Sequence, residues 1–134
     1  MNDLRAGVIG LGAMGSQYSR ILKTMRGINL VGIVEVDEKK LHDFSTELNV
    51  KPYKKADEFF DNEKPDFVVI SCPDEYHAEN TILALERNIH VHLEKPVADT
   101  YDNCIEILKA SKSSKAKLNI GYILRILPHY SRIR

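Results

Sequence analysis

Cysteine is scarce in this sequence, and the two cysteines are too far apart to suggest a paired site. Cys72 and Cys104 form no Cys-x-x-Cys motif. The sequence therefore has neither a disulfide framework nor a zinc signature. This usage is typical of a reducing compartment, so we expect the protein to be cytoplasmic.

Net charge and long apolar runs are also missing. Lysine plus arginine and aspartate plus glutamate number 19 each, so no basic field attracts nucleic acid or an anionic membrane. No apolar stretch approaches the about 20 residues that span a bilayer. The charged start, MNDLRAGVIG, has only a short apolar run, which argues against a signal peptide. We therefore predict neither nucleic acid nor membrane as a partner.

The sequence does contain alternating β-rich and amphipathic segments, with 43% hydrophobic residues over a length typical of one domain. Such alternation implies right-handed crossovers and an α/β fold with a doubly wound, mostly parallel sheet, the Rossmann fold. Strands are predicted at 6–10, 28–36, 50–53, 67–70, 89–93 and 117–121. Helices are predicted at 13–25, 37–48, 56–60, 75–87 and 100–113.

Polar residues mark several of these helix ends. Asp37 is placed to cap the second helix, and Asn88 is a plausible left-handed residue after the fourth. Either Asp99 or Thr100 opens the last helix, whose Ile105, Ile107 and Leu108 are predicted to pack inward.

A G-x-G-x-x-G motif, Gly10-Leu-Gly12-Ala13-Met14-Gly15, leaves the first strand and enters the first helix. This context turns a weak motif into a dinucleotide fingerprint. Gly10 permits the tight turn, Gly12 lets the backbone approach a pyrophosphate, and Gly15 lets the helix pack close to the strands. Free N–H groups and the helix dipole favour the anion there.

Glu35 ends the second strand about 20 residues after Gly15, where a carboxylate accepts hydrogen bonds from the adenosine ribose. Such a carboxylate repels a 2′-phosphate, so NAD is favoured over NADP. Asp37 competes for this role but is better used as the helix cap. Lys39 and Lys40 leave some room for NADP, although a solvated helix face is the simpler interpretation.

Two further segments lie at the carboxyl ends of predicted strands, where open α/β sheets bind ligands. Ser71-Cys-Pro-Asp-Glu-Tyr-His77 follows one strand, and His92-Leu-Glu-Lys-Pro96 ends the next. Lys95 offers a mobile cation that can polarise a substrate oxygen or exchange a proton, and Pro96 fixes the turn that aims it.

With these motifs in place, the sequence resembles the glucose-fructose oxidoreductase and inositol dehydrogenase family (Gfo/Idh/MocA). The resemblance spans nearly the whole chain. It is carried by GVIGLGAMG, the strand that ends in Glu35, DFVVISCPDEYH, ALERNIHVHLEKPVADT and LNIGYILRILP. It implies NAD(P)-dependent oxidation or reduction at a carbinol carbon of a sugar, cyclitol or sugar nucleotide.

The resemblance also implies roles for individual residues. The Gly10–Gly15 loop would hold the pyrophosphate and Glu35 the adenosine ribose. Cys72, Pro73 and His77 would line the cofactor channel, with a structural role as the alternative for His77. Glu94 would contact the nicotinamide ribose side, and Lys95 would be the active-site lysine. Because the family's Lys-Pro bond is often cis, we predict a cis Lys95–Pro96 peptide.

The chain departs from the family in one residue and in its length. Asp74 stands where the family often has asparagine. We assign residues 1–121 to the nucleotide-binding domain and 122–134 to the start of a connection to a second, substrate-binding domain that is absent. In the family that domain carries a second acid–base group and much of the subunit interface. We therefore expect cofactor binding without turnover, a homo-oligomer through the missing domain, and an exposed apolar patch around Tyr122, Ile123 and Ile126.

Other interpretations of the function remain open at this point. A nucleotide-binding regulatory or interaction module without chemistry would account for the short length. A dehydrogenase of the homoserine or aspartate-semialdehyde type would share the glycine loop but not the Glu-Lys-Pro motif. His90 and His92 share a strand face, but no third ligand is nearby in the sequence, so no metal is predicted.

Overall fold

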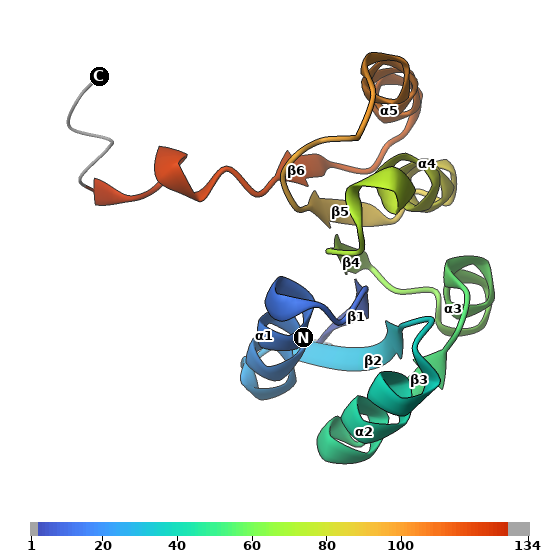
Figure 1. The fold of residues 1–134 in the computed structure, drawn as a ribbon, viewed down its shortest axis with the longest axis vertical. Helices are drawn as coiled ribbons and strands as arrows, with labels where there is room; N and C mark the ends of the chain where they lie inside the picture. Colours follow the sequence, from blue (N-terminus) through green and yellow to red (C-terminus); the bar gives the residue numbers. More distant parts are fainter. Residues whose placement is uncertain (1–2, 129–134) are drawn as a thin grey trace.

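The computed structural model describes residues 3–128 and contains one six-stranded sheet in the order β3-β2-β1-β4-β5-β6 (Figure 1). Every neighbouring pair of strands is parallel. This is the doubly wound topology expected from the alternating pattern. The strands are β1 (Leu4–Ile9), β2 (Ile28–Val34), β3 (Lys51–Tyr53), β4 (Phe67–Ile70), β5 (His90–Leu93) and β6 (Leu118–Ile120).

The helices cover the two faces of the sheet and bury two separate cores. The helices are α1 (Ala13–Thr24), α2 (Glu38–Leu48), α3 (Ala56–Glu63), α4 (His77–Glu86) and α5 (Tyr101–Ser113). Leu22, Leu41 and Leu48 of α1 and α2 share a buried cluster with residues of β1, β2 and β4. Residues of α3, α4 and α5 form the other cluster, against the opposite face. Side chains of parallel strands are thus covered on both sides, as their continuous apolar runs predict.

Local signals at helix ends are borne out. The Asp37 carboxylate accepts a hydrogen bond from the Lys40 N–H at 2.9 Å and caps α2. Thr100, rather than Asp99, caps α5 and accepts from the Asn103 N–H at 3.2 Å. Asn88 follows α4 with a positive φ of 56°, as predicted.

Several predicted boundaries are wrong by a few residues. The third helix continues past Phe60 to Glu63 and ends where Lys64 takes a left-handed conformation. The segment predicted as one helix from residue 75 begins as a 3₁₀ turn, Asp74–Tyr76, and becomes α-helical at His77. The predicted strand 28–36 ends at Val34, where the carboxylate of Glu35 begins to accept backbone N–H groups. Tertiary contacts decide such ends, which is why they are the least predictable part of an element.

Leu108 does not pack inward as predicted. Its side chain is 47% exposed, whereas Ile107 is 1% exposed. Successive residues of a helix are about 100° apart, so the face that buries Ile107 turns Leu108 toward the helix flank. Ile105 lies between these extremes.

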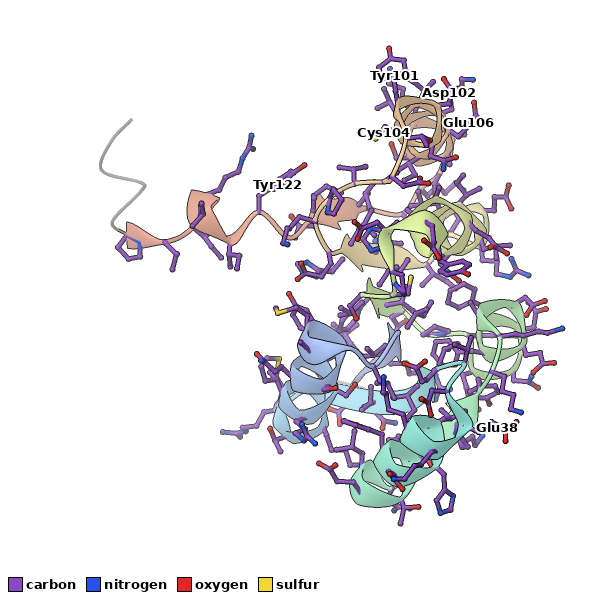
Figure 2. The ribbon with its side chains drawn as sticks, in the orientation of Figure 1. Glu38, Tyr101, Asp102, Cys104, Glu106 and Tyr122 are labelled. Carbon is purple, nitrogen blue, oxygen red and sulfur yellow. The ribbon has the colours of Figure 1, made fainter. Side chains whose placement is uncertain are left out.

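The segment after β6 leaves the sheet. Residues 122–128, which include a short 3₁₀ turn at Ile123–Arg125, extend away from the body of the domain (Figure 1). Tyr122, Ile123 and Ile126 are exposed, as predicted. Figure 2 shows the Tyr122 side chain on this extension. Residues 129–134, the rest of the predicted connection, lie outside the described residues.

One aromatic side chain of α3 packs against two glycines of the sheet. Phe59 is fully buried, and its ring lies directly over Gly7 of β1 and Gly32 of β2. A Cβ at Gly7 would come within 2.2 Å of this ring, and one at Gly32 within 2.7 Å. The register shift between Ala6 and Gly7 brings the two glycines opposite each other. The glycines thus leave a recess in the sheet that the ring fills.

Phe59→Ala should lower the free energy of unfolding by about 3–5 kcal/mol, because it opens a cavity that two glycines cannot fill. Urea unfolding followed by circular dichroism measures this value. Leu108→Ala, on the half-exposed flank of α5, is the control and should cost less than about 1 kcal/mol. A Phe59→Ala loss no larger than that of the control would show that the recess collapses without cost.

Candidate cofactor-binding and active site

The glycine loop forms a tight turn between β1 and α1. Gly10 has a φ of 85°, and a Cβ on it would lie 2.5 Å from the backbone of Cys72. A Cβ on Gly15 would lie only 1.8 Å from the carbonyl oxygen of Gly10. The protein's own packing therefore requires these two glycines, since any side chain would force the loop, α1 and β4 apart.

Gly12 differs from both of these glycines. A Cβ built there meets no protein atom within 4 Å, and its φ of −67° is open to any residue. Gly12 is the residue that precedes α1, and no side chain caps this helix. The first turn, which begins with Ala13 and Met14, contains no acidic residue. The loop therefore leaves open space in front of free helix N–H groups, an arrangement that suits an anion.

Glu35 anchors this loop to the end of β2. One carboxylate oxygen accepts a hydrogen bond from the Leu11 N–H at 2.8 Å. The other accepts from the N–H groups of Val36 and Asp37 at 2.9 and 3.1 Å. The sequence motif predicted a ligand-binding carboxylate here, and the structure adds that the same carboxylate holds the glycine loop in place.

The segment after β4 lies against the glycine loop. The Ser71 hydroxyl lies 3.0 Å from the carbonyl oxygen of Gly10, to which it donates. Burial raises the pKa of the neighbouring Cys72 thiol to about 11, which keeps it protonated and unsuited to act as a nucleophile. Pro73 follows in an extended conformation and leads into the 3₁₀ turn.

His77 joins the segments that follow β4 and β5. Its ring nitrogens lie 2.8 Å from the Pro96 carbonyl oxygen and 3.0 Å from that of Cys72. The side chain is 1% exposed, so its ring is enclosed by protein. This burial favours the structural alternative for His77 over a place in the channel lining.

The Glu94-Lys95-Pro96 segment follows β5 at the same edge of the sheet. The Lys95–Pro96 peptide is cis, as predicted. Lys95 and Pro96 are exposed, whereas the Glu94 side chain is 7% exposed. The Lys95 N–H donates to one oxygen of the Glu94 carboxylate at 3.2 Å. The turn thus places an exposed lysine directly after a buried carboxylate in the chain.

Tyr18 of α1 is a member of this site that the sequence did not reveal. Its hydroxyl donates to the other oxygen of Glu94 at 2.7 Å. Burial raises the pKa of Tyr18 to about 12, and the hydrogen bond to Glu94 adds to the rise. No pattern in a single sequence pairs Tyr18 with a residue at the end of a distant strand.

The histidines of β5 have protein partners of their own. The Nδ1 atom of His90 accepts from the Lys117 N–H at 2.8 Å, and His92 contacts Tyr18 and Asn119. Burial lowers the pKa of His92, with the charge of Glu94 opposing the shift. Within residues 3–128 no group of three or more His, Cys, Asp or Glu side chains is arranged to hold a metal ion.

The glycine loop, the β2 carboxylate and the Glu-Lys-Pro turn therefore meet at one edge of a parallel sheet. The model of an oxidoreductase family with an NAD-binding Rossmann fold, GFO_IDH_MocA, matches residues 4–122. The chain belongs to this family.

Similar proteins include enzymes that act on cyclitols and sugars. Inositol 2-dehydrogenase of Salmonella paratyphi B is 27% identical over 98% of this chain and 40% of its own length. The 2,7-anhydro-N-acetylneuraminate hydratase of Escherichia coli is 25% identical over 88% of this chain and 31% of its own. The crystal structure of myo-inositol 2-dehydrogenase from Lactobacillus plantarum superposes with a TM-score of 0.92 at 30% identity.

That superposition covers 98% of this chain and 40% of the solved one. The chain thus spans about two fifths of the length of the inositol dehydrogenases that it matches. Among the helices of residues 3–128, none is both long enough and apolar enough to cross a membrane.

In this family's Rossmann domain, the contrast between Gly12 and Gly15 predicts two separable substitutions. Gly12→Ala should leave the free energy of unfolding within about 1 kcal/mol of the parent, because the added methyl group meets no protein atom. It should weaken NAD⁺ binding at least about tenfold, because the methyl group enters the space for the pyrophosphate. Chemical unfolding and isothermal titration calorimetry measure the two effects.

Gly15→Ala is the matched variant and should behave in the opposite manner. It should destabilise the fold by about 1–3 kcal/mol or more, because its methyl group overlaps the Gly10 carbonyl. If the Gly12→Ala protein binds NAD⁺ as tightly as the parent, then a ligand does not require a glycine at this position.

Proposed function

We propose that this chain is the NAD-binding domain of a dehydrogenase that acts on a carbinol carbon of a sugar, cyclitol or sugar nucleotide. The observation that carries the proposal is Gly12, a glycine that no protein contact and no backbone angle requires. It stands in front of an uncapped helix, in the family's NAD-binding fold. The inositol dehydrogenases among the similar proteins support the substrate class.

The strand order supports one orientation of the cofactor along this edge of the sheet. The glycine loop follows β1, Glu35 follows β2 on one side, and Lys95 lies beyond β5 on the other. With the pyrophosphate at the loop, Glu35 would hold the adenosine half on the β2 side. Cys72, Pro73, Glu94 and Pro96 would line the nicotinamide side. The residues present fit a dinucleotide, since the ribose acceptor, the anion site and the proton-transfer group would follow one another along this edge of the sheet.

Lys95 is the residue we assign to proton transfer. When bound, the nicotinamide accepts or donates the hydride at the carbinol carbon. Lys95 is exposed, and its amine would hold the substrate oxygen and take up or release its proton. Within residues 3–128, Lys95 is the exposed lysine that follows β5, and we expect a further acid–base group to come from a substrate-binding domain. This chain alone would then bind cofactor without turnover.

A nucleotide-binding module without chemistry is the second candidate. It would use the same glycine loop and the same Glu35 carboxylate. The exposed Lys95 argues against it, because a module that only binds a nucleotide needs no lysine at this end of the site.

Cofactor choice follows from the charge near Glu35. The carboxylate would accept from a ribose hydroxyl and repel a 2′-phosphate. Lys39, which could have neutralised such a phosphate, lies 2.6 Å from the Asp43 carboxylate in an ion pair. Lys54 pairs with Glu38 in the same region. These pairs engage Lys39 and Lys54, whereas the carboxylate of Glu35 contacts the glycine loop, so we favour NAD over NADP.

NAD⁺ should therefore bind this chain at least about tenfold more tightly than NADP⁺, and Glu35→Ala should narrow the ratio of the two affinities. Because Glu35 also holds the Leu11 N–H, the variant should bind both cofactors less well. The ratio, measured by calorimetry, is therefore the informative quantity. Asp43→Ala, which frees Lys39 and leaves the loop intact, is the control and should shift the ratio toward NADP⁺ only slightly. Equal or tighter binding of NADP⁺ by the parent chain would refute this assignment.

In an enzyme that contains this chain as its nucleotide-binding domain, Lys95→Ala should lower turnover by about 10²- to 10⁴-fold, the usual range for a general acid–base group. NAD⁺ affinity should change little, because the glycine loop and Glu35 hold the other half of the cofactor. Steady-state assays with myo-inositol and titrations with NAD⁺ separate the effects. Lys117→Ala, another exposed lysine on the β5–β6 side, is the control. Unchanged turnover in the Lys95→Ala enzyme would show that Lys95 takes no part in proton transfer.

A further inference from the structure

A chain of polar side chains runs from the outer strand of the sheet to the buried carboxylate of Glu94. Asn119 of β6 lies with its amide nitrogen 2.9 Å from Nδ1 of His92 in β5. Nε2 of His92 lies 3.1 Å from the hydroxyl of Tyr18 in α1. That hydroxyl in turn lies 2.7 Å from Glu94. The Tyr18 and His92 rings also pack edge to face, with centroids 5.4 Å apart.

The number of protons available allows only one donor-to-acceptor direction along this series of hydrogen bonds. A tyrosine hydroxyl has a single proton, and a carboxylate can only accept, so Tyr18 donates to Glu94. The Tyr18 oxygen then accepts, which requires the proton of His92 to be on Nε2. The Nδ1 atom of His92 is left as an acceptor for the Asn119 amide. The two strands and α1 therefore cooperate to present a donor to one oxygen of Glu94.

Glu94 needs that donor because little else compensates its charge. Its side chain is 7% exposed, and the described residues provide it with no ion pair. Its hydrogen bonds come from Tyr18 and the Lys95 N–H. On the remaining side the carboxylate lies against Gly121, where an added Cβ would be 3.2 Å from it. Tyr18 thus sets where the charge of Glu94 lies.

We propose that Tyr18 is a positioning residue for the nicotinamide half of the cofactor site and acts by holding the Glu94 carboxylate. This inference rests on the proposed function, in which Glu94 faces the nicotinamide ribose. In this role Tyr18 would act on the cofactor only through Glu94. Its hydroxyl affects only ligands that extend past the pyrophosphate toward β5. The adenosine half, held by Glu35 and the glycine loop, is independent of it.

The test compares NAD⁺ with ADP, which lacks the nicotinamide half, by titration calorimetry on the 134-residue chain. Tyr18→Phe should weaken NAD⁺ binding on the order of tenfold, the effect expected for one hydrogen bond to a buried charge. ADP affinity should stay within about twofold. Tyr101→Phe, the same chemical change on a side chain that is 77% exposed on α5, is the control and should alter neither affinity (Figure 2).

A double-mutant cycle shows whether the effect passes through Glu94. In a Glu94→Gln background, Tyr18→Phe should weaken NAD⁺ binding by less than about twofold, because the charge that Tyr18 holds is gone. Nitrogen NMR of the parent chain should find the His92 proton on Nε2 near neutral pH. A proton on Nδ1 would contradict the donor-to-acceptor direction of these hydrogen bonds.

The outcomes separate this inference from the proposed function. Parent chain that binds ADP but not NAD⁺, or neither, overturns the proposed function and this inference with it. Parent chain that binds NAD⁺, with Tyr18→Phe equally tight, overturns the role of Tyr18 alone. Equal weakening of NAD⁺ and ADP would mean that Tyr18 merely supports α1, which also overturns it.

Discussion

The close contact of α1 with the end of β1 is the constraint on which the site depends. Gly15 lies so near the Gly10 carbonyl that no side chain fits between them, and a Cβ on Gly10 would lie 2.5 Å from the backbone of Cys72. This contact brings the free N–H groups of α1 to the carboxyl edge of the sheet, beside the segment that follows β4. A Cβ at either position would move the helix end away from that edge, and the anion site would be lost.

Two carboxylates lie on either side of this contact, and hydrogen bonds hold both of them. Glu35 accepts from Leu11, Val36 and Asp37, whereas Glu94 accepts from Lys95 and from the Tyr18 hydroxyl. Hydrogen bonds of this kind fix the direction of a carboxylate without a nearby cation. A dinucleotide that spans the edge would therefore meet a fixed negative charge at each end and a helix N-terminus in its middle.

Local sequence signals predicted most elements because each signal acts within a few residues. The cap at Asp37, the left-handed Asn88 and the apolar run at 67–70 appear in the structure as expected. Element ends and helix flanks were less predictable. Leu108 is half-exposed because it lies on the flank of α5, next to the buried Ile107. The third helix continues to Glu63, because packing against neighbouring elements decides which turn of a helix is the last one buried.

The sequence by itself determined the family, the order of strands and helices, and the chemical types at the cofactor edge, since motif spacing and periodicity are local properties of the chain. Only the tertiary structure decided which glycine faces open space and that Glu35 also holds the glycine loop. It also enclosed His77 between two carbonyl groups and paired Tyr18 with Glu94. The physical reason is that these contacts join residues from different elements, up to 76 positions apart, which no periodicity relates.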